Sequence, residues 1–182
     1  MSVTPIRLFG DPLLRSRAEE VVDFDRQLAL LIRDLTDTML QAAGAGLAAP
    51  QIGVGLRAFT YHVDGQVGHL VNPVIEPVGE EEDDAEEGCL SIPGLYFPCR
   101  RRLHIIARGV DLHGEPDEIA GSDMLARAIL HETDHLDGVL FIDRLDPDTR
   151  RVALAALRAA EWADQPTPAV KVSPHPVFGS VR

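Results

Sequence analysis

The 182-residue sequence predicts an α+β fold, in which short antiparallel strands pack around one central helix, with an N-terminal and a C-terminal helix outside them. Two observations predict this class. Apolar residues recur at helical spacing in three segments, 25–43, 123–137 and 147–164. Between the first two segments lie short stretches with strand-like composition, separated by glycine, proline and aspartate turn residues.

The first helix is expected over residues 25–43, with Asp23 or Asp25 capping its start and Gly44 ending it. Its buried face is predicted by five apolar residues at helical spacing: Leu28, Leu31, Ile32, Leu35 and Met39. Strand-like stretches follow at 56–63 and 67–75. Asp64-Gly65 between them indicates a β-hairpin.

Residues 80–87 carry seven acids in eight positions, and we interpret this run as a solvated loop. The alternative is functional, because negative charge near a metal site would raise the basicity of the metal ligands. Residues 103–110 are expected to form a strand, with another near 117–120.

The central helix is expected to begin at Ser122 or Asp123 and to stop at Gly138. Its buried face would carry three apolar residues: Leu125, Ile129 and Leu136. Asp146-Pro147 starts the last helix, which we expect to run to about residue 164. One side of that helix should carry Val152, Ala155, Ala159 and Trp162.

The chain length fits one domain, which we place at residues 1–164, followed by a proline-containing tail at 165–182 that should be extended or disordered. The net charge of −12 argues against a general nucleic-acid binder. Two cysteines imply no structural disulfide, which fits a reducing cytosol, and the N-terminus lacks the apolar region of a signal peptide. No apolar run approaches the ~20 residues of a membrane span. We therefore expect a cytoplasmic protein without membrane contact.

The segment His131-Glu132-Thr133-Asp134-His135 has the pattern of a metal-dependent hydrolase. Residues four apart share one face of a helix, so both histidines can bind one metal ion. Glu132 lies beside them, where a carboxylate can take a proton from water.

A catalytic metal needs a third protein ligand and an open position for water. Cys89 in Glu87-Gly88-Cys89 is the stronger candidate, because thiolates bind zinc and ferrous iron tightly. Spacing alone does not separate this role from that of a small buried residue. Four histidines offer alternatives: His62, His69, His104 and His113.

Three motifs, GAGLAAPQ at 44–51, EGCLS at 87–91 and HETDH at 131–135, resemble in sequence and order the signature motifs of the peptide deformylases. These enzymes remove the formyl group from the N-terminal methionine of new proteins. The resemblance covers residues 3–146 and implies the same α+β fold. It implies one divalent ion bound by Cys89, His131 and His135. It favours Fe²⁺, and the donor set also suits Zn²⁺, Ni²⁺ and Co²⁺.

In the mechanism that the resemblance implies, Glu132 accepts the proton of the attacking water and passes it to the leaving amine. The resemblance assigns the oxyanion donors to the side-chain amide of Gln51 and the backbone N–H of Leu90.

The resemblance also implies a substrate site. The backbone of Gly46 would bind the peptide, and Ala45, Met124, Arg127 and Ala128 would line the methionine pocket. Arg127 is expected to contribute only its alkyl stem, with its charge in water. The alternative is that Met124 and Ala128 are ordinary core residues. The family commonly has glutamine where this chain has Leu130, a position without a role in this mechanism.

Two rival functions remain at this point. An ordinary HExxH peptidase would take its third ligand from a residue after the helix, such as Asp137, Asp143 or Asp146. A deformylase-like protein could also bind metal or peptide without turnover.

The expected partners are formyl-methionyl nascent peptides, without membrane or specific DNA. Basic residues near the C-terminus suggest a weak, salt-sensitive ribosome contact: Arg150, Arg151, Arg158, Lys171 and Arg182. The alternative is a solvated basic face beside an inert tail.

Overall fold

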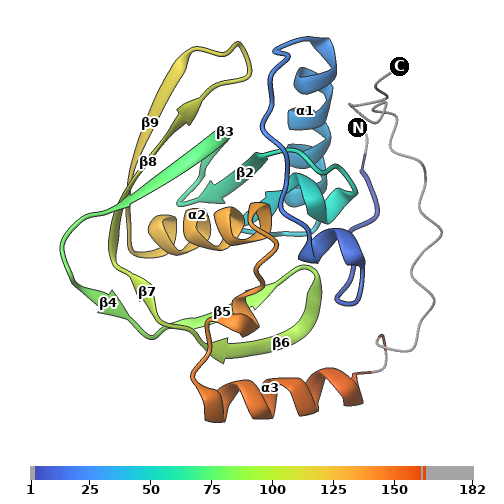
Figure 1. Cartoon of the computed structure of the whole chain (residues 1–182), viewed down its shortest axis with the longest axis vertical. Helices are drawn as coiled ribbons and strands as arrows, with labels where there is room; N and C mark the ends of the chain where they lie inside the picture. The colour runs from blue at the N-terminus through green and yellow to red at the C-terminus, as the bar shows by residue number, and fades with distance from the viewer. Residues whose placement is uncertain (1–2, 161, 163–182) are drawn as a thin grey trace.

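The computed structural model describes residues 3–160 and residue 162. Its helices are α1 (Arg26–Gln41), α2 (Asp123–Leu136) and α3 (Pro147–Ala159), with short 3-10 turns η1 (Pro12–Arg15), η2 (Ala49–Ile52) and η3 (Phe141–Asp143). Its strands are β1 (Gly46–Ala48), β2 (Ala58–Val63), β3 (Gln66–Pro77), β4 (Glu82–Asp83), β5 (Glu86–Cys89), β6 (Ile92–Pro98), β7 (Arg101–Arg102), β8 (His104–Val110) and β9 (Pro116–Ser122). The strands pair in antiparallel fashion, and the predicted α+β class is confirmed (Figure 1).

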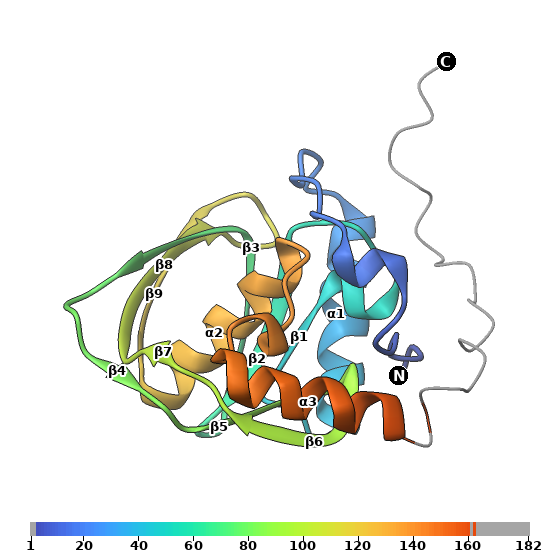
Figure 2. The same ribbon diagram turned by 60° about the horizontal axis from the view of Figure 1, so that its bottom comes forward.

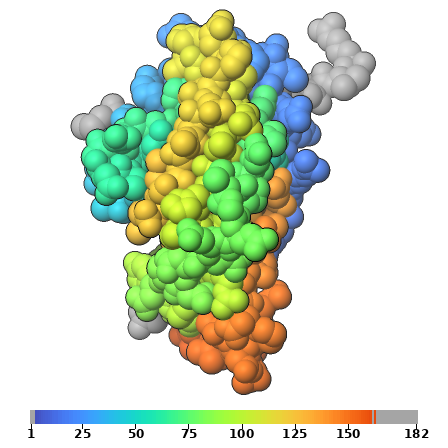
Figure 3. All heavy atoms as spheres, turned by 90° about the vertical axis from the view of Figure 1, so that its left-hand side faces the viewer, coloured from blue at the N-terminus to red at the C-terminus, as the bar shows by residue number. Residues whose placement is uncertain are grey.

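Five strands form one sheet in the order β1-β2-β3-β8-β9, and the other four form the ribbons β4-β7 and β5-β6. Helix α2 lies between the sheet and the β5-β6 ribbon, as two views show (Figures 1 and 2). It contacts β1, β2, β8 and β9 of the sheet, while α1 packs on β1 and β2, and α3 packs on β6. Figure 3 shows β8 and β9 on the outside of this arrangement, with α3 at the bottom. The structure thus has the expected central helix.

Helix α1 follows its sequence pattern closely. Oδ1 of Asp25 accepts hydrogen bonds from the backbone N–H groups of Gln27 and Leu28, so Asp25 is the cap. All five apolar residues of the predicted face are buried. The helix ends at Gln41, and Ala43, not Gly44, takes the left-handed conformation after it. A β carbon at Gly44 would lie 2.8 Å from Cδ1 of Leu90, so a larger residue there would displace the end of that side chain.

The predicted hairpin is present between β2 and β3. Asp64 and Gly65 form its two-residue turn, and both have positive φ, which matches the twist of the flanking strands. β3 continues to Pro77, beyond the expected end at residue 75.

Helix α2 begins after Ser122 and ends at Leu136, and Gly138 follows with a φ of 72°. Its buried face packs against the sheet through Ala126, Ile129 and Leu136, which share a core cluster with Phe59, Leu70 and Ile105. This packing fixes the orientation of the opposite side of the helix, which carries His131 and His135.

Helix α3 departs from the prediction. It ends at Ala159, and its buried residues are Ala153 and Leu157. Val152, Ala155 and Ala159 are exposed, so the predicted face was wrong for these three residues, whereas Trp162, beyond the end of the helix, packs against a core cluster. The reason is that residues 152–157 are all apolar, so the pattern does not distinguish one side of the helix from the other.

The predicted tail, with Lys171 and Arg182, and the domain boundary at residue 164 lie outside the described residues. Among the helices that the structure describes, none is long and apolar enough to cross a membrane.

Candidate metal centre

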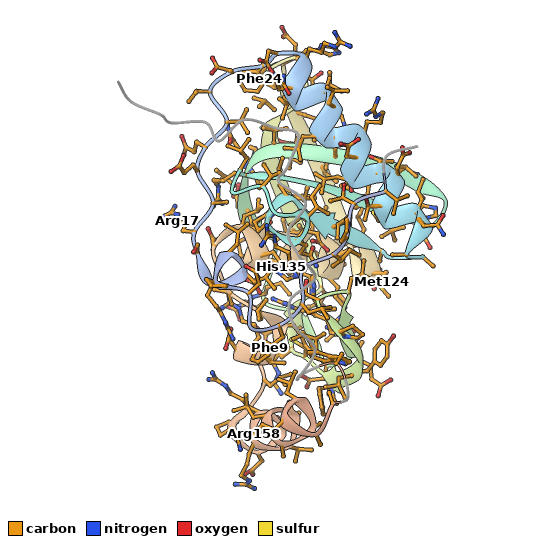
Figure 4. The ribbon with its side chains drawn as sticks, turned by 90° about the vertical axis from the view of Figure 1, so that its right-hand side faces the viewer. Phe9, Arg17, Phe24, Met124, His135 and Arg158 are labelled. Atoms are coloured by element: carbon orange, nitrogen blue, oxygen red, sulfur yellow. The ribbon has the colours of Figure 1, made fainter. Side chains whose placement is uncertain are left out.

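His131 and His135 lie one turn apart on α2, with their ring centroids 4.9 Å apart. Both side chains are buried, and His135 lies in the interior, whereas Met124 and Arg158 reach the surface (Figure 4). The apolar face of α2 is held by the sheet, so both imidazoles are directed toward the β5-β6 ribbon.

Cys89 ends strand β5, where a register shift between Gly88 and Cys89 interrupts the β5-β6 pairing. Its sulfur lies 3.2 Å from Nε2 of His135. The ligand atoms of Cys89, His131 and His135 all lie within 4.8 Å of one another. Within residues 3–160 and 162, these three residues form the only group of at least three His, Cys, Asp or Glu side chains with this geometry.

Two of the alternative histidines and all three alternative aspartates have other partners. Nε2 of His69 accepts a hydrogen bond from the backbone N–H of Leu112, and His104 bonds to Ser122. Asp137 pairs with Arg57, Asp143 with Arg15 and Arg150, and Asp146 caps α3. The carboxylates that could act as the third metal ligand of an ordinary HExxH peptidase are therefore paired with other groups, not with the two histidines.

The electrostatics of the site suit a divalent cation. Burial lowers the pKa of His131, but its hydrogen bonds with Cys89 and Glu87 outweigh burial and place that pKa well above the usual value. A metal ion bound to Nε2 of His131 would replace the proton of the ring, and the negative charges that raise this pKa would then stabilise the ion. Burial holds the pKa of His135 well below its usual value, so its ring is neutral, the form that binds metals. The residues present therefore fit a 2+ ion.

Glu132 is buried, and its Oε2 has no hydrogen-bond partner among the described residues. Burial is the main cause that raises its pKa to about 7, and the charge of Glu87 adds to the shift. A carboxyl group with this pKa can both accept and return a proton near neutral pH.

Gln51 lies in η2 and is buried beside Cys89. Its Oε1 accepts a hydrogen bond from the N–H of Ala48 at 2.8 Å, which fixes the side-chain amide. Nε2 then faces the candidate site, 3.7 Å from Sγ of Cys89 and 3.2 Å from Oγ of Ser91. The amide nitrogen of Gln51 thus donates hydrogen bonds to two residues of the cysteine motif.

A cavity of about 460 Å³ opens beside these groups. Ten of the eleven site residues predicted from the sequence line it: Ala45, Gly46, Gln51, Cys89, Leu90, Met124, Arg127, Ala128, His131 and Glu132. His135 lies behind the lining. Met124 is 53% exposed, so the alternative that Met124 is a core residue is wrong. Leu130 packs against the core cluster between α2 and the sheet.

Arg127 contradicts its prediction. Its guanidinium group is buried and donates to Oε2 of Glu87 at 3.0 Å and to the carbonyl of Cys99 at 2.6 Å. The charge was expected in water because long basic side chains usually keep their charged end in solvent. It is instead held inside the protein by two acids of the run at 80–87, Glu87 and Asp83.

The acidic run is also not a plain loop, because parts of it form β4 and β5. Six of its acids are exposed, but Glu87 is 5% exposed and accepts a hydrogen bond from Nδ1 of His131 at 2.6 Å. Arg101 donates two further hydrogen bonds to it. Burial raises the pKa of Glu87, but the hydrogen bonds from Arg101 and His131 outweigh it and hold the carboxyl well below its usual range. The loop interpretation was wrong for this residue.

Sequence reasoning missed Glu87 and Arg101 as site residues. A signal was present, because the acidic run is followed by Arg100-Arg101-Arg102, and each of these arginines pairs with an acid of the run. Glu87 and Cys89 are also two residues apart on one strand, so their side chains share a face.

The chain matches the family model described as polypeptide deformylase over residues 3–151. It is 60% identical over 179 residues to the peptide deformylase of Acidothermus cellulolyticus, covering 98% of both chains. It is 58% identical to that of Parafrankia sp., covering 100% of both. Among solved structures, a peptide deformylase from Legionella pneumophila superposes with a TM-score of 0.81 at 40% identity, covering 90% of this chain and 99% of that one.

These matches span the fold and all three motifs, and they decide between the rival functions left open by the sequence. The chain belongs to the peptide deformylase family, metal-dependent hydrolases that remove the formyl group from the N-terminal methionine of newly made proteins.

Proposed function

We propose that this chain performs deformylation with one divalent ion bound by Cys89, His131 and His135. The observation that carries the proposal is the convergence of the three ligand atoms within 4.8 Å, beside a cavity lined by Glu132 and Gln51. The ion supplies Lewis acidity, which lowers the pKa of water and stabilises negative charge on oxygen. A thiolate with two imidazoles suits Fe²⁺, which we propose as the native ion, and also Zn²⁺, Ni²⁺ and Co²⁺.

In the proposed mechanism Glu132 is the general base and acid. It removes a proton from the attacking water and delivers it to the amine that leaves. The pKa of about 7 supports both steps, since neither form of the carboxyl is strongly favoured at neutral pH. Glu132 lines, with His131, the cavity that we propose for the substrate.

Negative charge develops on the formyl oxygen as water adds. We propose that the Gln51 amide and the backbone N–H of Leu90 donate hydrogen bonds to it. Gln51 is held with its Nε2 toward Cys89, and Leu90 is the next residue after Cys89. Donors fixed before the reaction stabilise the transition state without reorganisation, each by about 2.7–4 kcal/mol.

The methionine side chain is proposed to enter the part of the cavity between Ala45, Met124 and Ala128. Ala128 is buried, so it can form a floor, while the exposed Met124 can flank the entrance. Arg127 contributes to this wall without an exposed charge, because Glu87 holds its guanidinium group. The backbone of Gly46 is available to a peptide strand at the edge of the sheet.

We further propose a cytoplasmic location and a weak ribosome contact, since the substrate is a chain under synthesis. Arg151 and Arg158 are exposed on α3, and Arg151 pairs with the exposed Asp148. Reversing both charges should weaken co-sedimentation with ribosomes at low salt and leave peptide hydrolysis intact. Unchanged co-sedimentation would contradict the proposed contact between this face of α3 and the ribosome.

The proposed activity is tested with formyl-Met-Ala-Ser and detection of formate. Protein purified without air should release formate from this peptide. A chelator should abolish the activity, and added Fe²⁺ or Co²⁺ should restore it. Acetyl-Met-Ala-Ser, assayed for acetate, is the matched control, and it should be hydrolysed more slowly because its methyl group adds bulk at the reacting carbonyl. Absence of formate release from the metal-loaded protein would contradict the proposal.

A further inference from the structure

We propose that Asp134 and Arg101 are positioning residues of the metal centre, which act on His131 through Glu87. This inference rests on the proposed binding of the metal ion by Cys89, His131 and His135. It assigns a task to the fourth residue of the HETDH motif, whose side chain does not line the cavity.

The first link of this chain of contacts is Glu87. One of its carboxylate oxygens, Oε1, accepts hydrogen bonds from Nδ1 of His131 at 2.6 Å and from Nη2 of Arg101 at 2.7 Å. The other oxygen, Oε2, accepts a hydrogen bond from Nε of Arg101 at 2.9 Å. The paired bonds from Arg101 fix the plane of the carboxylate, and the carboxylate fixes the ring of His131 with Nε2 free for a ligand bond.

The second link is Asp134. Its Oδ2 accepts a hydrogen bond from Nη1 of Arg101 at 2.6 Å. Arg144 donates to the same carboxylate from the other side, to Oδ1 at 2.6 Å and to Oδ2 at 3.1 Å. Asp134 and Arg101 are both buried, so these contacts are little screened by water.

The arrangement of charge explains why Asp134 matters for Arg101. The Asp134 carboxylate separates two guanidinium groups, those of Arg101 and Arg144. Without its charge, the two cations would face one another across a neutral amide, and Arg101 would be displaced from its place on Glu87. Glu87 would then lose the paired bonds that orient it and keep the single bond from Arg127 to Oε2, so the partner of His131 would be less firmly fixed.

Groups that orient a metal ligand typically contribute 10–100-fold to metal affinity or activity. The predicted effect is therefore measured as the rate at which the protein loses its metal ion, which does not depend on turnover. The full chain is loaded with Zn²⁺, and release of the ion into a coloured chelator is timed at neutral pH. We expect Asp134→Asn to release zinc about 10-fold faster than the wild type.

The pathway through Glu87 is tested with a double-mutant cycle. If Asp134 acts through Glu87, Asp134→Asn should have little further effect on zinc release in a Glu87→Gln background. If Asp134→Asn accelerated zinc release in the Glu87→Gln background as much as in the wild type, the pathway through Glu87 would be overturned. Wild-type release rates in the Asp134→Asn single variant would overturn the inference as a whole.

Asp137→Asn is the matched control. Asp137 follows the same helix and pairs with a buried arginine, Arg57, at 2.7 Å, but it makes no contact with Arg101 or Glu87 that the structure records. We expect zinc release at the wild-type rate. Equal acceleration by Asp137→Asn would indicate general loosening of α2 and would overturn the assigned role.

Arg101→Lys gives a second route if Asp134→Asn does not fold. A lysine ammonium keeps the charge but cannot make the paired bonds to Glu87 while reaching Asp134. We expect faster zinc release and an altered visible spectrum of the Co²⁺-loaded protein, which reports the ligand geometry. An unchanged rate and spectrum would contradict the proposal. Failure of the wild type to bind zinc would instead contradict the proposed metal centre itself.

Discussion

The carboxylate of Glu132 lies directly against the backbone of Gly46. A β carbon built on Gly46 would stand 2.3 Å from Oε1 of Glu132 and 2.8 Å from its Cγ, closer than such atoms approach in proteins. The first and third motifs are thus in contact, and glycine at position 46 makes room for the proposed general base.

Gly46→Ala should therefore greatly reduce deformylation. The methyl group would push the Glu132 carboxylate from its position, and general acid-base catalysis contributes about 10²–10⁴-fold. We expect kcat to fall by at least 10²-fold while the metal content stays near one ion per chain. Steady-state kinetics with formyl-Met-Ala-Ser measures this.

Gly55→Ala is the control for that substitution. A β carbon at Gly55 would meet only Cδ1 of Leu13, at an ordinary 3.6 Å. We expect near-normal kcat. If Gly46→Ala were as active as Gly55→Ala, the contact between residue 46 and Glu132 would not constrain catalysis.

Glu132→Gln should bind metal normally and lose most activity. The amide keeps the shape of the side chain but cannot accept the proton of water, so the expected loss is about 10²–10⁴-fold in kcat. Elemental analysis and kinetics on the same preparation separate the two effects. A near-normal kcat with metal in place would mean that another group carries the proton.

Arg127→Met should destabilise the fold, in contrast to the effect expected of a solvated arginine. It would leave part of the Glu87 charge and the carbonyl of Cys99 without a donor inside the protein. Removing one partner of a buried ion pair costs about 3–5 kcal/mol of unfolding free energy. Urea denaturation of the metal-loaded protein measures it. Arg108→Met is the control, since Arg108 pairs with Glu76 and Glu118 on the surface and its loss should change little. Equal effects of the two substitutions would contradict the structural role of Arg127.

His69 should make the stability pH-dependent. Burial lowers its pKa, and its Nε2 must be unprotonated to accept the N–H of Leu112 at 3.1 Å. Because the pKa is lower in the folded protein, neutral His69 stabilises the fold above the unfolded pKa of about 6.5, and this contribution is lost as the pH falls through the folded pKa.

His69→Phe, which keeps a ring but has no hydrogen-bond acceptor, tests this prediction by comparison with the wild type at two pH values. The substitution should cost about 0.5–1.5 kcal/mol at pH 7.5, the usual contribution of one hydrogen bond, and less at pH 5. The difference between the two proteins cancels the titration of other groups. The same cost at both pH values would show that protonation of His69 plays no part.

Local patterns predicted those parts of the molecule in which one side differs clearly from the other. The face of α1 was predicted because its apolar residues recur at helical spacing and polar residues interrupt them after Ile32. Residues 152–157 of α3 are apolar throughout, and their buried side depends on contact with β6. The candidate ligands and Glu132 were found because short motifs carry them. Glu87 was missed because its partners, Arg101, Arg127 and His131, lie 14, 40 and 44 residues away, and only the fold brings them to the acidic run.

The central claim is that Cys89 completes the metal site with His131 and His135. Elemental analysis of Cys89→Ala, purified without air beside the wild type, tests it most directly. The wild type should hold close to one divalent ion per chain. The variant should lose it, since two histidines alone leave an incomplete site. A full metal complement in Cys89→Ala, with normal formate release, would contradict the account.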